Sequence, residues 1–169
     1  MEILISEEQL RARIIALGEQ ITEDYRGRPL TIVAVLVGSV VALADLIRQV
    51  TIPHRVALLQ TSSYRGKTTL PTDLAVNSAF DPDVKGRDVL LLDDILDTGH
   101  TLKRVMDDMA NRGALSVRTM VLLRKLGRQQ VSLEPDYVGF EIPDRFVVGY
   151  GLDYNDDYRH LPYVAILPG

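Results

Sequence analysis

The sequence predicts an α/β protein with a twisted, mainly parallel sheet that is flanked by helices. Two stretches carry this prediction. Residues 31–37 and 89–92 are almost wholly apolar, which is typical of strands buried on both faces of a sheet. Each stretch is followed by a turn and then by apolar residues at helical spacing. Strands that alternate with helices in this way favour a parallel sheet covered by helices.

The composition indicates one domain spanning residues 1–169. Hydrophobic residues make up 46% of the chain and charged residues 25%, which is ordinary for a globular protein. No apolar run approaches the ~18 residues that span a membrane, and the acidic N-terminus lacks the basic region of a signal peptide. The net charge of −4 argues against a nucleic-acid partner. The absence of cysteine is compatible with the cytoplasm, where we expect the protein to act.

A helix is expected close to the N-terminus. Ser6 with Gln9 three residues later is a capping-box signature. The apolar positions that follow mark one helical face: Leu10, Ile14, Leu17 and Ile21.

The first buried strand is expected to lead through the turn Gly38-Ser39 into an apolar helix over residues 40–50. A tight turn that needs a small residue is the simplest interpretation of Gly38. Residues 55–60 favour another strand. Residues 61–80 have no clear period and are long for a plain connection, which favours a lid over a site, with an ordinary surface loop as the alternative.

Carboxylates follow the second buried strand. We expect Asp93 and Asp94 where this strand emerges from the core at its carboxyl end, the edge at which open α/β sheets bind ligands. Residues 97–101 then lead into a helix. Backbone N–H groups at a helix start bind phosphate, and carboxylates accept hydrogen bonds from sugar hydroxyls or help to hold Mg²⁺. This combination suits a ribose phosphate, and a solvated acidic turn in an ordinary crossover is the alternative.

The last third of the chain is expected to contain a strand over residues 116–123 that ends at Arg124-Lys125, followed by an aromatic tail. The three histidines lack the spacing of metal ligands, so we expect no zinc site.

Residues 89–101, Val-Leu-Leu-Leu-Asp-Asp-Ile-Leu-Asp-Thr-Gly-His-Thr, resemble the phosphoribosyl pyrophosphate (PRPP) binding motif of type I phosphoribosyltransferases. The tail at 134–155 is similar to the hypoxanthine-guanine branch of that family. The resemblance implies the type I phosphoribosyltransferase fold, with a core at about 30–125 and a small hood formed by the terminal segments, about 1–25 and 126–169.

The resemblance also implies roles for the PRPP-binding residues. Asp97 matches the acid/base at purine N7. The residues that match the binding site for the ribose and the 5′-phosphate are Asp93, Asp94, Thr98, Gly99, His100 and Thr101. The residues that match the pyrophosphate-binding site are Gly38, Ser39 and Arg159. The start of the lid matches Ser63 and Tyr64. Val37 departs from the family, which usually has a basic residue at this position.

The purine-binding residues implied by the resemblance are Lys125, Phe146, Val147 and Asp153. Lys125 matches the lysine that contacts the 6-oxo group, and Phe146 the aromatic that stacks on the base. Asp93, Asp94 and Asp153 match the acids near Mg²⁺. Without the resemblance, two simpler interpretations are expected. Lys125 would be a solvated lysine at a strand end, and Phe146 would be a buried ring in an aromatic hairpin.

The function implied is Mg²⁺-dependent transfer of 5-phosphoribosyl from PRPP to hypoxanthine or guanine, which forms IMP or GMP and pyrophosphate in purine salvage. The resemblance also implies a homodimer or homotetramer. Two alternatives stay open: a xanthine-preferring phosphoribosyltransferase, and a non-catalytic regulator of the same fold that binds nucleotide or RNA.

Overall fold

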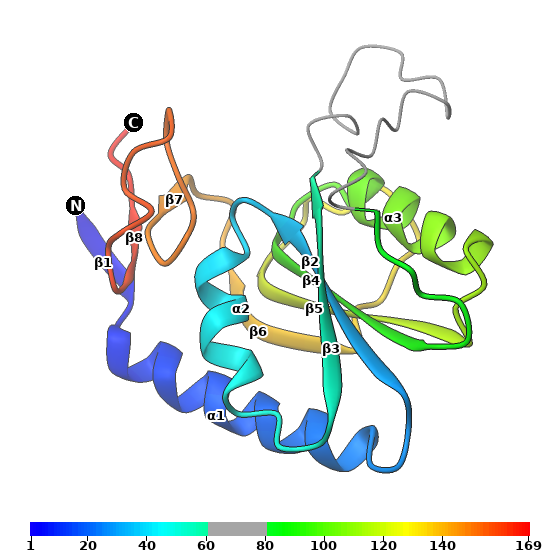
Figure 1. The fold of residues 1–169 in the computed structure, drawn as a ribbon. Helices are drawn as coiled ribbons and strands as arrows, with labels where there is room; N and C mark the ends of the chain where they lie inside the picture. Colours follow the sequence, from blue (N-terminus) through cyan, green and yellow to red (C-terminus); the bar gives the residue numbers. More distant parts are fainter. Residues whose placement is uncertain (61–80) are drawn as a thin grey trace.

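A five-stranded sheet forms the centre of the computed structural model, which describes residues 1–60 and 81–169 (Figure 1). Its strand order is β3-β2-β4-β5-β6, and all neighbours pair in parallel. The strands are β2 (Leu30–Leu36), β3 (His54–Gln60), β4 (Asp88–Leu96), β5 (Ser116–Lys125) and β6 (Tyr137–Ile142). The predicted α/β fold class is confirmed.

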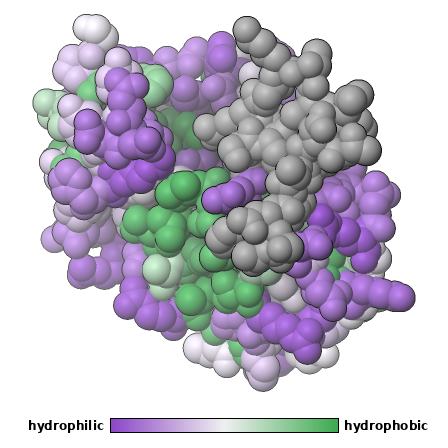
Figure 2. Space-filling model, turned by 45° about the horizontal axis from the view of Figure 1, so that its top comes forward, coloured by the Kyte–Doolittle hydropathy of each residue, from purple (hydrophilic) through white to green (hydrophobic). Residues whose placement is uncertain are grey.

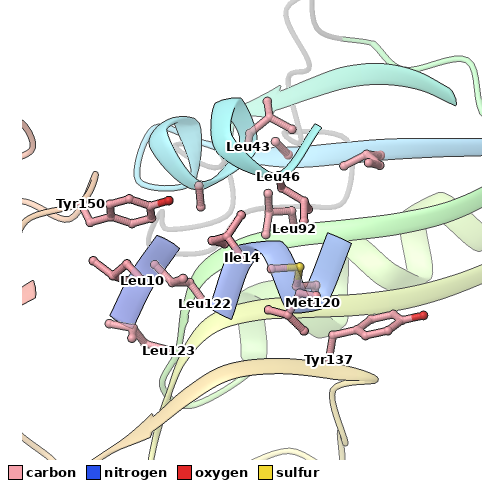
Figure 3. Packing of buried hydrophobic residues seen from close by; sticks show 14 of the residues in the cluster. Leu10, Ile14, Leu43, Leu46, Leu92, Met120, Leu122, Leu123, Tyr137 and Tyr150 are labelled. Carbon is pink, nitrogen blue, oxygen red and sulfur yellow. The ribbon is translucent and has the colours of Figure 1, made fainter. Parts of the chain in front are cut away.

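Helices cover both faces of this sheet. The first face carries α1 (Glu7–Asp24) and α2 (Val40–Ile47), whose apolar residues join one buried cluster with the sheet, shown in Figure 3. The second face carries α3 (His100–Asn111), which packs into a separate cluster. The expected capping box is present at the start of α1. Ser6 Oγ accepts from Gln9 N at 3.2 Å, and Ser6 N donates to Gln9 Oε1 at 2.9 Å.

Two predicted boundaries are wrong. Helix α2 ends at Ile47 rather than residue 50, since the chain then turns so that Thr51 N donates to Thr22 Oγ1 of α1 at 3.1 Å. Strand β4 does not end at Asp93 and Asp94 but continues to Leu96. Its pairing with β5 extends to Leu96, whose side chain is only 2% exposed and anchors the strand end in the core.

A register difference around β4 exposes its acidic end. Pairing between β2 and β4 stops at Ala34 and Leu92, whereas pairing between β4 and β5 runs four residues further, to Leu96. Asp93 and Asp94 therefore lie in a part of β4 that has a neighbouring strand on the β5 side only.

A small antiparallel sheet, here called the hood, lies at one end of the molecule (Figure 1). It consists of β1 (Glu2–Ile5), β8 (Val164–Ile166) and β7 (Val147–Val148), in that order. Helix α1 and strand β6 fall in the ranges expected for the hood, but they belong to the layers of the main sheet. No helix in the described part of the chain is long and apolar enough to span a membrane.

Candidate active site

A cavity of about 210 Å³ opens at the carboxyl ends of β2 and β4. The chain leaves β2 toward β3 on one side and leaves β4 toward β5 on the other, so the cavity lies where the strand order reverses. This is the usual ligand position in open α/β sheets. Seven predicted site residues line it: Gly38, Asp93, Asp94, Asp97, Thr98, Gly99 and Thr101.

The loop over residues 37–39, here called the pyrophosphate loop, approaches β4 closely. The peptide bond between Leu36 and Val37 is cis. A Cβ on Gly38 would overlap the Asp94 carboxylate, so a larger residue would displace this carboxylate or the loop. Ser39 is buried, and its Oγ donates to Val35 O at 2.5 Å. Ser39 therefore does not line the cavity, and its hydroxyl is bonded to the backbone of β2.

The turn over residues 97–101, here called the PRPP loop, ends at the start of α3. Gly99 is the residue before the helix and has φ of 93°, in the left-handed region that favours glycine. A Cβ there would also lie 2.6 Å from Val131 Cγ2. The first-turn N–H groups of α3 have no partners within the helix, and donors of this kind are suited to a phosphate.

Residues beyond β5 hold the PRPP loop from outside. Gln130 N donates to Thr98 O at 2.9 Å, and the Gln130 Oε1 lies 3.0 Å from His100 Nε2. His100 is thus directed toward Gln130, and its exposed side chain does not line the cavity.

Asp93 and Asp94 are half-buried, and each carboxylate accepts a hydrogen bond from the backbone N–H of the next residue. Asp93 Oδ1 accepts from Asp94 N at 2.9 Å, and Asp94 Oδ1 accepts from Ile95 N at 2.7 Å. No three acidic or histidine side chains converge as a metal cage within residues 1–60 and 81–169. Two carboxylates beside a turn suited to phosphate nevertheless fit Mg²⁺, which proteins commonly hold through one or two carboxylates and the phosphates of a substrate.

Asp97 lies among cationic side chains. Arg128 Nε donates to Asp97 Oδ1 at 2.8 Å, and Lys125 Nζ lies 3.9 Å from Oδ2. Asp144 Oδ1 lies 3.8 Å from Lys125 Nζ and 3.9 Å from Arg128 Nε. The hydrogen bond to Asp97 raises the pKa of Arg128 above its usual value. Two carboxylates therefore flank two cations between the PRPP loop and the hood.

Phe146 is 53% exposed, so the alternative of a buried ring is wrong. Its ring meets the ring of Tyr154 edge to face, with centroids 5.7 Å apart. Val147 follows in β7 and is buried. Lys125 is 13% exposed and held between carboxylates, which differs from a solvated lysine at a strand end. An exposed aromatic face and a sheltered ammonium suit a flat base that carries an oxygen.

Arg159 bonds within the hood segment. Its Nη1 donates to Gly151 O at 2.7 Å, and its Nη2 lies 3.2 Å from Asp153 Oδ1. Gly151 in turn packs on the Gly38 carbonyl so closely that a Cβ would overlap it. Arg159 thereby reaches the pyrophosphate loop through one intervening residue. It lines a second cavity of about 550 Å³ between α1, α2 and residues 150–162, and Asp153 lines neither cavity.

Ser63 and Tyr64, the predicted start of the lid, lie outside the described residues. Two charged residues of the cluster around Lys125 were missed by the sequence prediction, Arg128 and Asp144. A signal for Arg128 existed: Gly127 follows the end of β5 closely and has φ of 76°, so the chain turns there and returns a cation toward the strand ends.

Comparison with known proteins identifies the family. The model of the phosphoribosyl transferase domain matches residues 4–155. A hypoxanthine phosphoribosyltransferase from Salmonella typhimurium is 43% identical over 167 residues, covering 98% of this chain and 94% of the relative. A hypoxanthine-guanine phosphoribosyltransferase from Staphylococcus aureus is 39% identical over 166 residues, covering 98% and 93%.

Solved structures agree with these relatives. A hypoxanthine-guanine phosphoribosyltransferase from Bacillus anthracis, solved with a HEPES molecule in its active site, superposes with a TM-score of 0.90 at 36% identity and covers 99% of both chains. The chain belongs to the phosphoribosyltransferase family, and within it to the group of hypoxanthine and hypoxanthine-guanine phosphoribosyltransferases.

Proposed function

We propose that the chain transfers the 5-phosphoribosyl group of PRPP to hypoxanthine or guanine, the purines in the names of its relatives. The observation that carries the proposal is the cavity at the reversal of strand order. It combines a helix start for a phosphate, two carboxylates for a ribose and a glycine turn for a second phosphate group.

The parts of PRPP are assigned by chemistry. The PRPP loop takes the 5′-phosphate through Thr98, Gly99, His100 and Thr101, and of these His100 contributes its backbone. Asp93 and Asp94 accept from the ribose hydroxyls, since ionised carboxylates only accept hydrogen bonds. Gly38 and Ser39 face the pyrophosphate with backbone groups. Arg159 supplies a cation after leaving its partners Gly151 and Asp153.

The base lies between Phe146 and the Asp97–Lys125 pair. Phe146 offers a ring face for stacking, and the backbone of Val147 faces the base edge. Lys125 donates to the 6-oxo group, which favours oxopurines because the amino group of adenine would meet a like donor. Asp153 lies near the exocyclic side of the base, the role that the resemblance implies for it.

We include Mg²⁺ as the cofactor, held by Asp93 and Asp94 with the substrate, and Asp153 as a further acid near it. When bound, the ion offsets negative charge that develops on the departing pyrophosphate. The residues of the chain do the rest. They align the two substrates, hold the ribose against the cavity wall and keep a carboxylate at the N7 side of the base.

The transfer balances with one proton. The lone pair of purine N9 forms a bond to C1′ of the ribose while the bond from C1′ to the pyrophosphate oxygen breaks, and that oxygen keeps the electron pair. Asp97 accepts the proton that leaves N7, or stabilises the charge on the ring before the proton departs. IMP or GMP and pyrophosphate are the products.

A spectrophotometric assay tests the function. It offers hypoxanthine, guanine, xanthine and adenine separately with PRPP and Mg²⁺. We expect turnover with the first two bases. Turnover with xanthine alone would instead support a xanthine-preferring enzyme. A folded protein that binds PRPP and turns over no base would support a non-catalytic regulator, and binding of RNA at moderate salt would then extend that result.

A substitution tests the assignment of Asp97. Asp97→Asn keeps the size of the side chain and removes its charge and its capacity to accept a proton. We expect kcat to fall by about 100-fold or more, while the KM for PRPP changes little. Unchanged turnover would refute the assignment.

We further propose a homo-oligomer, a dimer or tetramer, that forms through α2. An apolar patch occupies the middle of the face in Figure 2, where α2 reaches the surface. Val37, three residues before this helix, is 51% exposed, and Val40, its first residue, is 41% exposed. Light scattering of Val40→Glu tests the proposal, because a charge there would separate the subunits. A cytoplasmic location remains a prediction, which fractionation of expressing cells would test.

A further inference from the structure

We propose that Arg128 is a positioning residue that fixes the orientation of Asp97. The inference rests on the proposed function, in which Asp97 acts at purine N7. Arg128 follows the end of β5 and reaches back to the PRPP loop, where its Nε donates to Asp97 Oδ1 at 2.8 Å. Arg128 is not among the residues assigned to substrate binding.

The two oxygens of Asp97 have different neighbours. Oδ1 is bonded to Arg128, whereas Oδ2 lies 3.9 Å from Lys125 Nζ, beyond hydrogen-bond distance. Arg128 thus holds one oxygen and leaves the other on the side of Lys125. A guanidinium suits this task because it is planar and always charged, so the bond keeps its direction.

The orientation of Asp97 matches the edge of an oxopurine. N7 and O6 are neighbours on one edge of the base, where both are read together. A carboxylate oxygen directed to N7 and an ammonium directed to O6 must therefore lie side by side, as Asp97 Oδ2 and Lys125 Nζ do. Rotation of the carboxylate would turn this oxygen away, and Arg128 is the group that opposes the rotation.

Asp144 completes the arrangement on the hood side. Its Oδ1 is 3.8 Å from Lys125 Nζ and 3.9 Å from Arg128 Nε. Lys125 therefore stands at nearly equal distances from two carboxylates, with no close bond to either, and is able to turn to a third acceptor. Arg128 is committed to Asp97. In this cluster Lys125 is the cation that binds the base, and Arg128 is the cation that orients the Asp97 carboxylate.

The Arg128–Asp97 pair contributes little to folding. The side chain of Arg128 is 43% exposed and that of Asp97 is 40% exposed, and ion pairs this open to water add little stability. Variants at Arg128 should therefore fold, which lets their effect on turnover be measured without loss of structure.

Steady-state kinetics with hypoxanthine tests the inference. Arg128→Met keeps the aliphatic stem and removes all donors. We expect a fall in kcat of about tenfold with a KM for PRPP within about twofold of wild type, because only the alignment of Asp97 changes. Arg128→Lys should recover part of kcat. Arg26→Met is the matched control, since Arg26 also makes an exposed ion pair, with Glu23 at 2.5 Å, but neither residue lines the cavity, and it should leave kcat unchanged.

A double-mutant cycle separates positioning from a direct role. On an Asp97→Asn background, Arg128→Met should cause no further loss of kcat, because its only route to the reaction has been removed. An equal tenfold loss on both backgrounds, or no loss on the wild-type background, would overturn the inference.

Crystal structures make the test independent of turnover. Wild type should keep Asp97 Oδ1 on Arg128, and Arg128→Met should show the carboxylate in another rotamer. A wild-type enzyme that turns over no base would refute the proposed function alone, whereas an unmoved Asp97 carboxylate in Arg128→Met would refute the role of Arg128 alone.

Discussion

Gly38 lies against the carboxylate of Asp94, so closely that a single added carbon would overlap it. This contact joins the end of β2 to the acidic end of β4 at the point where the two strands no longer pair. Gly38→Ala should force the pyrophosphate loop and the Asp94 carboxylate apart. We expect kcat/KM for PRPP to fall by about 100-fold, since a shift of about 1 Å between these groups misaligns the substrate. Val37→Ala in the same loop is the control, and equal losses in both variants would contradict the contact as the cause.

Phe146 should contribute to binding of the base rather than to stability. Because its ring is 53% exposed, Phe146→Ala should leave the melting temperature nearly unchanged. Loss of stacking should raise the KM for hypoxanthine by about tenfold, the lower part of the range for a stacked base. Phe146→Tyr keeps the ring and should keep the KM. A large fall in stability without a change in KM would indicate a structural ring instead.

Val37 offers a test of the departure from the family pattern. Its exposed side chain adjoins Gly38, so Val37→Lys places a cation at the pyrophosphate loop. We expect pyrophosphate to inhibit this variant several-fold more strongly than wild type, with the gain reduced by salt. Thr51→Lys adds the same charge at an exposed position beyond the other end of α2 and should change inhibition less. Equal effects would indicate a general electrostatic field rather than a site at residue 37.

Asp88 should stabilise the fold in a pH-dependent manner. At the start of β4 it accepts from Arg28 at 2.8 Å and 3.2 Å and from Ser116 at 2.6 Å. The hydrogen bonds from Arg28 hold the pKa of this carboxyl below its usual value. The stabilisation is therefore present above the unfolded pKa of about 4 and is lost as pH falls through the lower folded pKa.

Asp88→Asn should lower the free energy of unfolding at pH 7 by about 2 kcal/mol, because it leaves a charged Arg28 without its partner. Urea unfolding at pH 7 and pH 3 measures the difference. The gap between variant and wild type should narrow at the lower pH, and a gap that does not depend on pH would rule out the carboxylate charge as its source.

Two buried tyrosines near the amino ends of the strands should respond oppositely to loss of the hydroxyl. Tyr25 Oη has no hydrogen-bond partner among the described residues, so Tyr25→Phe should leave stability unchanged or raise it slightly. Tyr137 Oη donates to Asp24 Oδ2 at 2.6 Å, so Tyr137→Phe should cost about 1–2 kcal/mol. Thermal unfolding of both variants decides between these outcomes, and a larger loss in Tyr25→Phe would reverse the interpretation.

Local patterns predicted the elements that depend on neighbours in the chain. The capping box at Ser6 and Gln9 and the buried strands β2 and β4 follow from side chains close in sequence, and the structure contains all of them. The end of β4 could not be read this way. Whether Asp93 and Asp94 lie inside or beyond the strand depends on β5, which supplies backbone partners as far as Leu96.

The same limit applies to the site. The two turns that line the cavity carry their own signatures, and Gly38 and Gly99 both occupy positions that a larger residue would not fit. The partner of Asp97 is different. Arg128 lies 31 positions further along the chain and reaches Asp97 only because β4 and β5 are neighbours. Pairwise contacts of this kind depend on sheet order, which one sequence does not state.

The hood joins the two ends of the chain, since Glu2 of β1 pairs with Ile166 of β8. During synthesis, β2, β4 and β5 leave the ribosome long before β8, so the sheet and both substrate turns can form while β1 still lacks its partner. Pairing across so long a separation is slow because a large loop must close first. A nascent chain would thus carry the two turns that line the cavity before the hood, whose sheet closes only after residues 164–166 have been synthesised.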